Sequence, residues 1–233
     1  MKNKIFITSL FLSLACTAFA QKNWFRLQKD STALIQEATL IKDLFVSDIN
    51  SIKPGWNFSL KTTIKTTPML VYYDSQTAHL PLWSQLPEQI QNWFYEIGEN
   101  KNDGQEIFGL FFNGFYLPHE LAHGFEDTLG KLNRSYKNEY FANTIAILWF
   151  RKHGYLKELE KCYETAKVIM AKTPNPVPNG QTAENFFTKN YNEILLSGNP
   201  SVYGFMQFGQ FIKIYEDKTL PDFDTFIKTY LSN

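Results

Sequence analysis

After one or two N-terminal helices, the hydrophobic pattern of this chain changes from strand-like to helical, and that order limits the folds it can adopt. Residues 58–73 are rich in Thr, Ile and Val and end in Tyr72 and Tyr73, which is typical of strands. Strands followed by helices predict an α+β fold with a small mixed or antiparallel sheet and a mainly helical C-terminal half. The apolar spacing predicts one or two helices in 24–46, one that begins at Pro87, and then 118–127, 136–152, 156–171, 182–195, 200–216 and 222–231.

An apolar and aromatic run, residues 107–115, precedes the first helix of the C-terminal half. Its composition predicts a strand. Gly109 and Gly114 either mark a bulge in this strand or allow a backbone to approach closely, and both interpretations stay open. Ahead of the run, Asn102-Asp103-Gly104 is a turn signal.

The first twenty residues have the layout of a secretory signal peptide. Lys2 and Lys4 precede a short apolar stretch, and Ala18-Phe19-Ala20 offers small residues at a cleavage site before Gln21. We therefore expect a signal peptide at 1–20, a single domain at 21–233, and a secreted or periplasmic protein. Anchoring as a lipoprotein through Cys16 is a minor alternative, because Leu14 stands one place too close to the cysteine for a good lipobox.

The charge and cysteine content exclude several classes of function. The 23 basic and 23 acidic side chains balance, and removal of Lys2 and Lys4 would leave a small negative excess. No basic excess is present to bind nucleic acid, and no later stretch is long and apolar enough to span a membrane. Only Cys162 would survive processing, so no internal disulfide can form, and we expect this thiol to be buried in a helix.

A pair of histidines with a glutamate between them, in the segment His119-Glu120-Leu121-Ala122-His123, is the strongest functional signal. Residues four apart lie on one face of a helix, so both imidazoles can reach one metal ion. Glu120 is turned about 100° from His119 and can instead point at a water beside the ion. Pro118, immediately before the pair, suits the first turn of a helix.

A catalytic zinc site needs a third protein ligand, and Glu139 is the best candidate for it. Sixteen residues separate it from His123, which is enough for a helix end, a turn and a returning helix. Alternatives are Glu126 and Asp127 on the first helix, and His79 after the predicted strands. His153 lies at the end of a predicted helix, where a cation is favoured, and is expected to be structural.

Asn143 stands four residues after Glu139, so the two side chains face the same way on the next helix. Its amide could orient one of the imidazoles from behind. These two motifs, HELAH and EYFAN, resemble those of the gluzincins, the thermolysin-like zinc metallopeptidases. The resemblance covers about residues 107–150, and it departs from thermolysin in having Asn143 where an Asp is usual and a shorter spacing between the motifs.

The resemblance implies a zincin-like domain whose active-site helix lies between the sheet and the helical half. It implies that His119, His123 and Glu139 bind Zn²⁺ and that Glu120 is the general base, with Asn143 behind the ligands. The expected activity is hydrolysis of amide bonds in a peptide or protein by a water at the zinc. Tyr203, at the start of a late helix, is the candidate donor to the oxyanion. In proteins of this type an edge strand pairs with an extended substrate, so the predicted strand 107–115 would form the edge of the cleft.

Two other functions remain open from the sequence. A secreted protein that retains a metal for binding or interaction, without turnover, would show the same motifs, and its aromatic residues could line a protein- or glycan-binding groove. A metallohydrolase acting on a non-peptide amide is the third possibility. The sequence does not indicate the oligomeric state.

Overall fold

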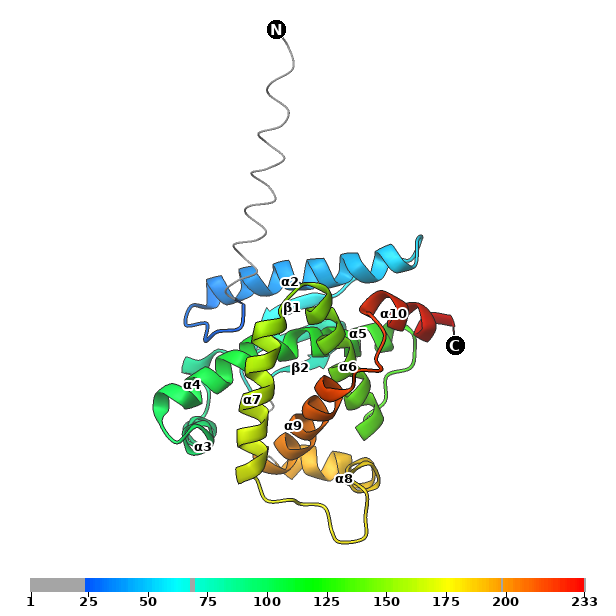
Figure 1. Cartoon of the computed structure of the whole chain (residues 1–233). Helices are drawn as coiled ribbons and strands as arrows, with labels where there is room; N and C mark the ends of the chain where they lie inside the picture. Colours follow the sequence, from blue (N-terminus) through cyan, green and yellow to red (C-terminus); the bar gives the residue numbers. More distant parts are fainter. Residues whose placement is uncertain (1–23, 68–69, 198, 233) are drawn as a thin grey trace.

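The computed structural model describes residues 24–67, 70–197 and 199–232, so the predicted signal peptide and Cys16 lie outside the described residues. The described chain is α+β, with a small sheet in its first half and a helical second half, which confirms the predicted class (Figure 1). Its elements are α2 (Ser31–Ile52), β1 (Lys61–Ile64), β2 (Tyr72–Asp74), β3 (Thr77–Leu80), η1 (Trp83–Gln85), α3 (Glu88–Gly98), α4 (Lys101–Leu110), η2 (Phe111–Phe115), α5 (Tyr116–Thr128), α6 (Tyr136–Lys152), α7 (Leu156–Lys172), α8 (Ala183–Ser197), α9 (Pro200–Glu216) and α10 (Phe223–Ser232).

The sheet is mixed and has the strand order β1-β3-β2. β1 runs parallel to β3, and β2 runs antiparallel to it. Ser75 and Gln76, both with positive φ, form a two-residue turn between β2 and β3, the geometry that tight hairpins favour. The prediction of strands in 58–73 included β1 and most of β2 but missed β3, which carries His79.

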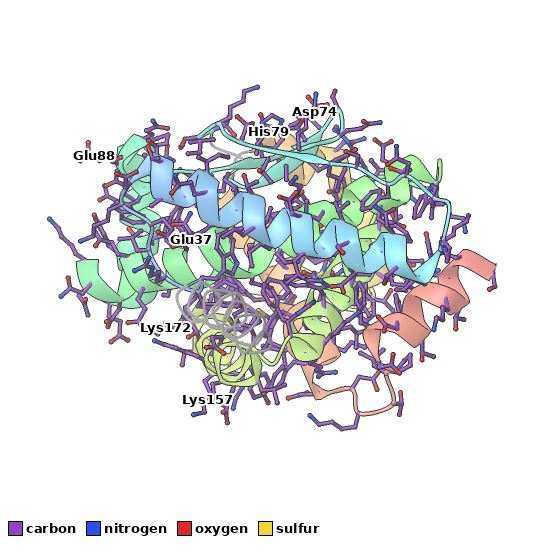
Figure 2. All side chains as sticks on the ribbon, turned by 90° about the horizontal axis from the view of Figure 1, so that it is seen from above. Glu37, Asp74, His79, Glu88, Lys157 and Lys172 are labelled. Atoms are coloured by element: carbon purple, nitrogen blue, oxygen red, sulfur yellow. The ribbon has the colours of Figure 1, made fainter. Side chains whose placement is uncertain are left out.

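The helix α2 lies across the molecule and covers the sheet and the centre of the fold (Figure 1). Seen from above, it runs alongside the strands that carry Asp74 and His79, with Glu37 on the side away from those strands (Figure 2). Leu34, Ala38, Ile41, Phe45 and Ile49 form its buried stripe, at intervals of three or four residues. The predicted helix in 24–46 therefore exists, but it begins at Ser31, where Asp30 caps it through the backbone N–H groups of Thr32 and Ala33.

The predicted strand 107–115 is wrong, because these residues are helical. They form the second half of α4 and the π-helical turn η2, which continues into α5. All of them except Phe112 are buried, so the run is apolar on every side, and a short fully buried helix cannot be told from a buried strand by periodicity. The turn predicted at Asn102-Asp103-Gly104 is the first turn of α4, which Asn100 caps.

Gly109 and Gly114 allow close packing, but against this chain's own N-terminal segment. A Cβ on Gly109 would lie 2.2 Å from the backbone nitrogen of Leu27, and one on Gly114 would lie 2.9 Å from the ring of Phe25. The strand bulge and the approach of a substrate backbone are therefore both wrong as explanations of these glycines. Their small size lets the N-terminal segment pack directly on the helix that leads into α5.

Pro118 lies in the first turn of α5, as predicted, and its ring has a specific consequence there. It has no N–H to donate to the carbonyl of Gly114, four residues earlier. That carbonyl accepts a hydrogen bond from the indole Nε1 of Trp24 instead, at 2.9 Å. The π-helical turn before it adds a residue to one helical turn, which rotates α5 by about 100° relative to α4. Together these features set the direction in which α5 presents its side chains.

The helix α6 is fixed at its C-terminal end by Asp48 of α2. The Asp48 carboxylate accepts hydrogen bonds from the indole of Trp149 at 2.8 Å and pairs with Lys152 at 2.9 Å and His153 at 2.6 Å. His153 is the C-cap residue of α6, so its predicted structural place is confirmed. These contacts hold the helix whose N-terminal half reaches the centre of the molecule.

A main hydrophobic core surrounds α5 and α6. The buried side chains of α8 belong to a second, smaller cluster that is separate from this core. The small cluster centres on Phe187, Tyr191, Ile194 and Met206, and α8 lies at the opposite end of the molecule from α2 (Figure 1). Cys162 is buried in α7, as predicted, and burial raises the pKa of its thiol. Within the described ranges, no helix is long and apolar enough to cross a membrane.

Candidate metal centre

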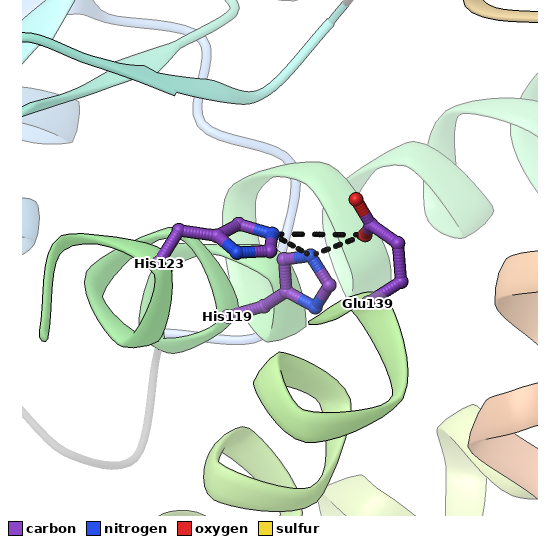
Figure 3. Close-up of side chains that lie close together, drawn as sticks. All are labelled: His119, His123 and Glu139. Carbon is purple, nitrogen blue, oxygen red and sulfur yellow. Dashed lines mark hydrogen bonds and ion pairs between the residues drawn. The ribbon is translucent and has the colours of Figure 1, made fainter. Parts of the chain in front are cut away.

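The structure brings His119, His123 and Glu139 together in the interior. The two histidines come from successive turns of α5 and the glutamate from the first turn of α6 (Figure 3). Nε2 of His119 lies 3.1 Å from Nε2 of His123 and 3.1 Å from Oε2 of Glu139, and Nε2 of His123 lies 3.6 Å from the same oxygen. All three side chains are buried, with relative exposures of 2%, 7% and 3%.

These separations fit one tetrahedral metal ion. Nitrogen and oxygen ligands about 2.0–2.1 Å from a zinc ion lie about 3.3 Å from one another in a tetrahedral site. The three observed separations, between 3.1 and 3.6 Å, fall around that value. Among the described residues, these three are the His, Cys, Asp or Glu side chains whose ligand atoms converge, and three ligands would leave a fourth position for water or substrate.

Local sequence explains how Glu139 reaches α5. Gly130 has φ of +66° and ends α5, with its N–H bonded to the carbonyl of Asp127. Ser135 then caps α6 by accepting the N–H of Asn138. The chain therefore turns back within a few residues and places Glu139 in the first helical turn, facing the histidines. This is the helix, turn and return that the spacing predicted.

Asn143 lies one turn further along α6, behind His119. Its Oδ1 is 2.9 Å from Nδ1 of His119, and because an amide oxygen can only accept, Nδ1 must carry the proton. The lone pair of His119 Nε2 is then directed at the place where the ligand atoms of His119, His123 and Glu139 meet. Nδ1 of His123 has no hydrogen-bond partner within the described part of the chain, so the two imidazoles are held unequally.

The buried charges at this site depend strongly on one another. Burial alone would lower the pKa of His123, but the negative charge and hydrogen bond of Glu139 outweigh it and raise this pKa to about 9. Burial would raise the pKa of Glu139, yet His123 and His119 hold it well below its usual value. Burial raises the pKa of Glu120, and the two imidazoles partly oppose that effect. Glu139 is therefore the carboxyl group that its surroundings keep ionised, and its charge faces the two imidazoles.

The other candidates for a third ligand are engaged elsewhere. The Glu126 carboxylate accepts from Asn138 and, at 3.0 Å, from the hydroxyl of Tyr230, and burial raises its pKa to about 7. Asp127 accepts from Tyr73 at 2.6 Å, which ties the β-hairpin to α5. His79 stacks on Tyr72 with ring centres 4.4 Å apart. Glu126, Asp127 and His79 are therefore not among the side chains whose ligand atoms converge.

Glu120 and Tyr203 both line the cleft that opens onto the three converging side chains. The cleft has a volume of about 550 Å³. Its walls come from residues 70–73, which include part of β2, from α5 and its preceding turn, and from α8 and α9. Most lining side chains are apolar or aromatic, among them Trp93, Phe112 and Phe208. Glu120 and Tyr203 therefore line the same cleft as the three converging side chains, and their roles as general base and oxyanion donor stay predictions.

Sequence reasoning missed the polar side chains that contact Glu139 from the C-terminal helices. The hydroxyl of Tyr191 donates to its Oε1 at 2.5 Å, and Nε2 of Gln207 donates to its Oε2 at 2.6 Å and to the hydroxyl oxygen of Tyr203 at 3.1 Å. A signal was present, because Tyr203, Gln207 and Gln210 recur at intervals of four and three in an otherwise apolar helix. Polar residues on one face of a buried helix indicate a polar site facing that side.

Comparisons of the chain with protein-family models, curated proteins and solved structures found no significant match. The resemblance to gluzincins thus depends on the two motifs and on the arrangement of the residues within them.

Proposed function

We propose that this chain is a zinc-dependent metallohydrolase that cleaves peptide bonds, built on a zincin-like arrangement of sheet, active-site helix and helical half. The observation that carries the proposal is the convergence of His119, His123 and Glu139 at the floor of a cleft that also contains Glu120. Two imidazoles and one carboxylate with an open fourth position are one of the ligand sets found in catalytic zinc sites. A zinc ion held there would polarise the scissile carbonyl and lower the pKa of water.

The protein's own groups would then act on the substrate as follows. The Glu120 carboxylate accepts the proton of the attacking water and passes it to the leaving amine. The Tyr203 hydroxyl donates to the oxyanion, and the hydrogen bond it accepts from Gln207 makes it a stronger donor. Apolar walls exclude water from the cleft and strengthen both interactions.

An extended peptide is the substrate that the cleft fits best. β2 is an edge strand of the sheet, because the order is β1-β3-β2 among the described residues. Leu70, Val71, Tyr72 and Tyr73, at and before this edge, line the cleft. A peptide could add to the edge by backbone hydrogen bonds while its side chains meet the aromatic wall. In this proposal β2 has the substrate-pairing role that the sequence assigned to residues 107–115.

The experiment is cleavage of a peptide library by the purified chain, with and without a zinc chelator, beside Glu120→Gln. We expect cleavage that the chelator abolishes and added zinc restores. Glu120→Gln should keep its zinc and lose at least about 10²-fold in rate. Glu160→Gln, an exposed change on α7, is the matched control and should behave as the wild type.

Two outcomes would oppose the proposal in different ways. Retained zinc with no cleavage of any library peptide would favour the alternative, a metal-retaining binding protein without turnover. Cleavage that persists in excess chelator, or in Glu120→Gln, would refute the proposed roles of the metal and of Glu120. Secretion of the chain stays a prediction from residues 1–20 and is tested by finding whether the mature N-terminus is Gln21.

A further inference from the structure

Behind the site, three buried side-chain amides form a continuous network. Nδ2 of Asn143 donates to Oε1 of Gln207 and to Oε1 of Gln210, both at 2.9 Å. Nε2 of Gln210 donates to the backbone carbonyl of Tyr136 at 2.9 Å, and Nε2 of Gln207 donates to Glu139. The relative exposures of Asn143, Gln207 and Gln210 are 0%, 4% and 1%, so water cannot replace these bonds at low cost.

The direction of every bond in this network is fixed from its two ends. The carbonyl of Tyr136 can only accept, so Gln210 must turn its NH₂ group towards it and its oxygen towards Asn143. The carboxylate of Glu139 can only accept, so Gln207 must do the same. Two amide oxygens then face one end of Asn143, and that end must be its NH₂ group. Its oxygen is left for His119, whose Nδ1 therefore holds the proton.

We infer that Gln207 and Gln210 are positioning residues that orient Asn143 and, through it, keep His119 in the tautomer that binds a metal. Gln207 has a second role, since it also holds the Glu139 oxygen that faces both imidazoles. This inference rests on the proposed metal site. It explains how a neutral asparagine can take the place of a carboxylate behind a ligand histidine. The two glutamine oxygens of α9 accept from the Asn143 NH₂ group, so the Asn143 oxygen faces His119.

A negative charge at position 143 should weaken metal binding in this chain. A carboxylate there would normally be the stronger partner for an imidazole N–H. In this chain, one oxygen of Asn143→Asp would face the oxygens of Gln207 and Gln210. Neither glutamine can turn round without opposing its own oxygen to the carbonyl of Tyr136 or to the carboxylate of Glu139. Asn143→Asp should therefore weaken zinc binding, although it supplies the residue usual in the family.

The test measures zinc affinity by competition with a chromophoric chelator, for the full chain and its variants. We expect Gln207→Met to weaken binding about 10-fold and Gln210→Met somewhat less, as for partners behind a ligand histidine. Asn143→Asp should weaken binding when both glutamines are present and strengthen it in the Gln207→Met/Gln210→Met background, a change of sign that a merely structural role would not produce. Gln28→Met, a buried glutamine paired with Glu37 away from the site, is the control and should match the wild type.

A second measurement keeps the inference testable without metal or in variants that fold poorly. Imidazole ¹⁵N shifts at pH 8 should show a proton on Nδ1 of His119 in the metal-free wild type, and partial loss of the Nδ1 proton in the double Met variant. A wild-type His119 without a proton on Nδ1, or zinc binding that Asn143→Asp tightens with both glutamines in place, would overturn the inference. Absence of zinc binding by the wild type would instead refute the proposed function, while the tautomer still tests the network.

Discussion

Oδ1 of Asn143 lies 2.9 Å from Nδ1 of His119, and both side chains are buried against α9 and the core. Removing this partner should loosen the imidazole and free its tautomer. We expect Asn143→Ala to lower zinc affinity by about 10- to 100-fold. Equilibrium competition with a chelator measures this, and an affinity within twofold of the wild type would show that Asn143 does not support the ligand.

Tyr203 is the proposed donor to the oxyanion, and its phenylalanine variant tests that role. Tyr203→Phe should lower kcat by about 10²-fold with a small change in KM, since the interaction forms in the transition state. Zinc content should stay at the wild-type level, because the hydroxyl is not among the converging ligand atoms. Steady-state kinetics on a peptide found by the library assay, with metal analysis of the same sample, provides the measurement. An unchanged kcat in fully loaded Tyr203→Phe would assign the oxyanion donor elsewhere.

Two helical glycines should respond oppositely to the same substitution. A Cβ on Gly109 would lie within 2.2–2.9 Å of backbone atoms of Arg26 and Leu27, which cannot move aside cheaply. Gly109→Ala should cost about 3 kcal/mol or more of unfolding free energy. A Cβ on Gly209 in α9 would meet only the flexible end of Met170 at 3.5 Å, so Gly209→Ala should be neutral or more stable by about 0.5–1 kcal/mol. Denaturant titration of both variants decides, and equal stabilities would contradict the packing described for Gly109.

The Asp48 cluster gives a pH dependence of stability. Burial raises the pKa of Asp48, but hydrogen bonds from His153 and Lys152 outweigh it and lower this pKa below its usual 3.8. A carboxyl group whose pKa is lower in the folded state stabilises the fold above its unfolded pKa and loses that contribution as pH falls through the folded value. Asp48→Asn should therefore cost about 1–3 kcal/mol at neutral pH, and the difference from wild type should shrink below about pH 4.

The control for that prediction is Asp43→Asn, on the same helix. Its carboxylate pairs with Lys42 at the surface, so its removal should change stability by less than about 0.5 kcal/mol at any pH. A constant difference between Asp48→Asn and wild type from pH 7 to pH 3 would rule out the proposed contribution of the ionised Asp48.

The parts of the site with a fixed helical spacing could be predicted from the sequence. His119 and His123 share a face of α5 because they are four residues apart. Glu139 faces them because Gly130 ends α5 and Ser135 begins α6 after a short connection. The helices from 136 to 231 were also placed within about two residues, since caps and apolar stripes mark them clearly.

Other features depend on tertiary contacts that no local pattern contains. Residues 107–115 are all buried except Phe112, so their sequence has neither the period of a helix nor that of a strand. Glycine is needed at position 114 because the ring of Phe25, which is distant in the sequence, would lie 2.9 Å from a Cβ there. Gln207 and Gln210 could have been singled out by their spacing with Tyr203, but their partners on α6 emerge only when α9 packs against it.

A zinc titration of the metal-free chain decides whether His119, His123 and Glu139 hold one zinc ion, as we propose. We expect one tightly bound zinc per chain, lost in Glu139→Ala and in His119→Ala but retained in Glu126→Gln, whose carboxylate lies nearby without joining the three converging groups. A wild-type chain that binds no zinc, or a Glu139→Ala variant that binds it as tightly as the wild type, would show that these three side chains do not form a zinc site.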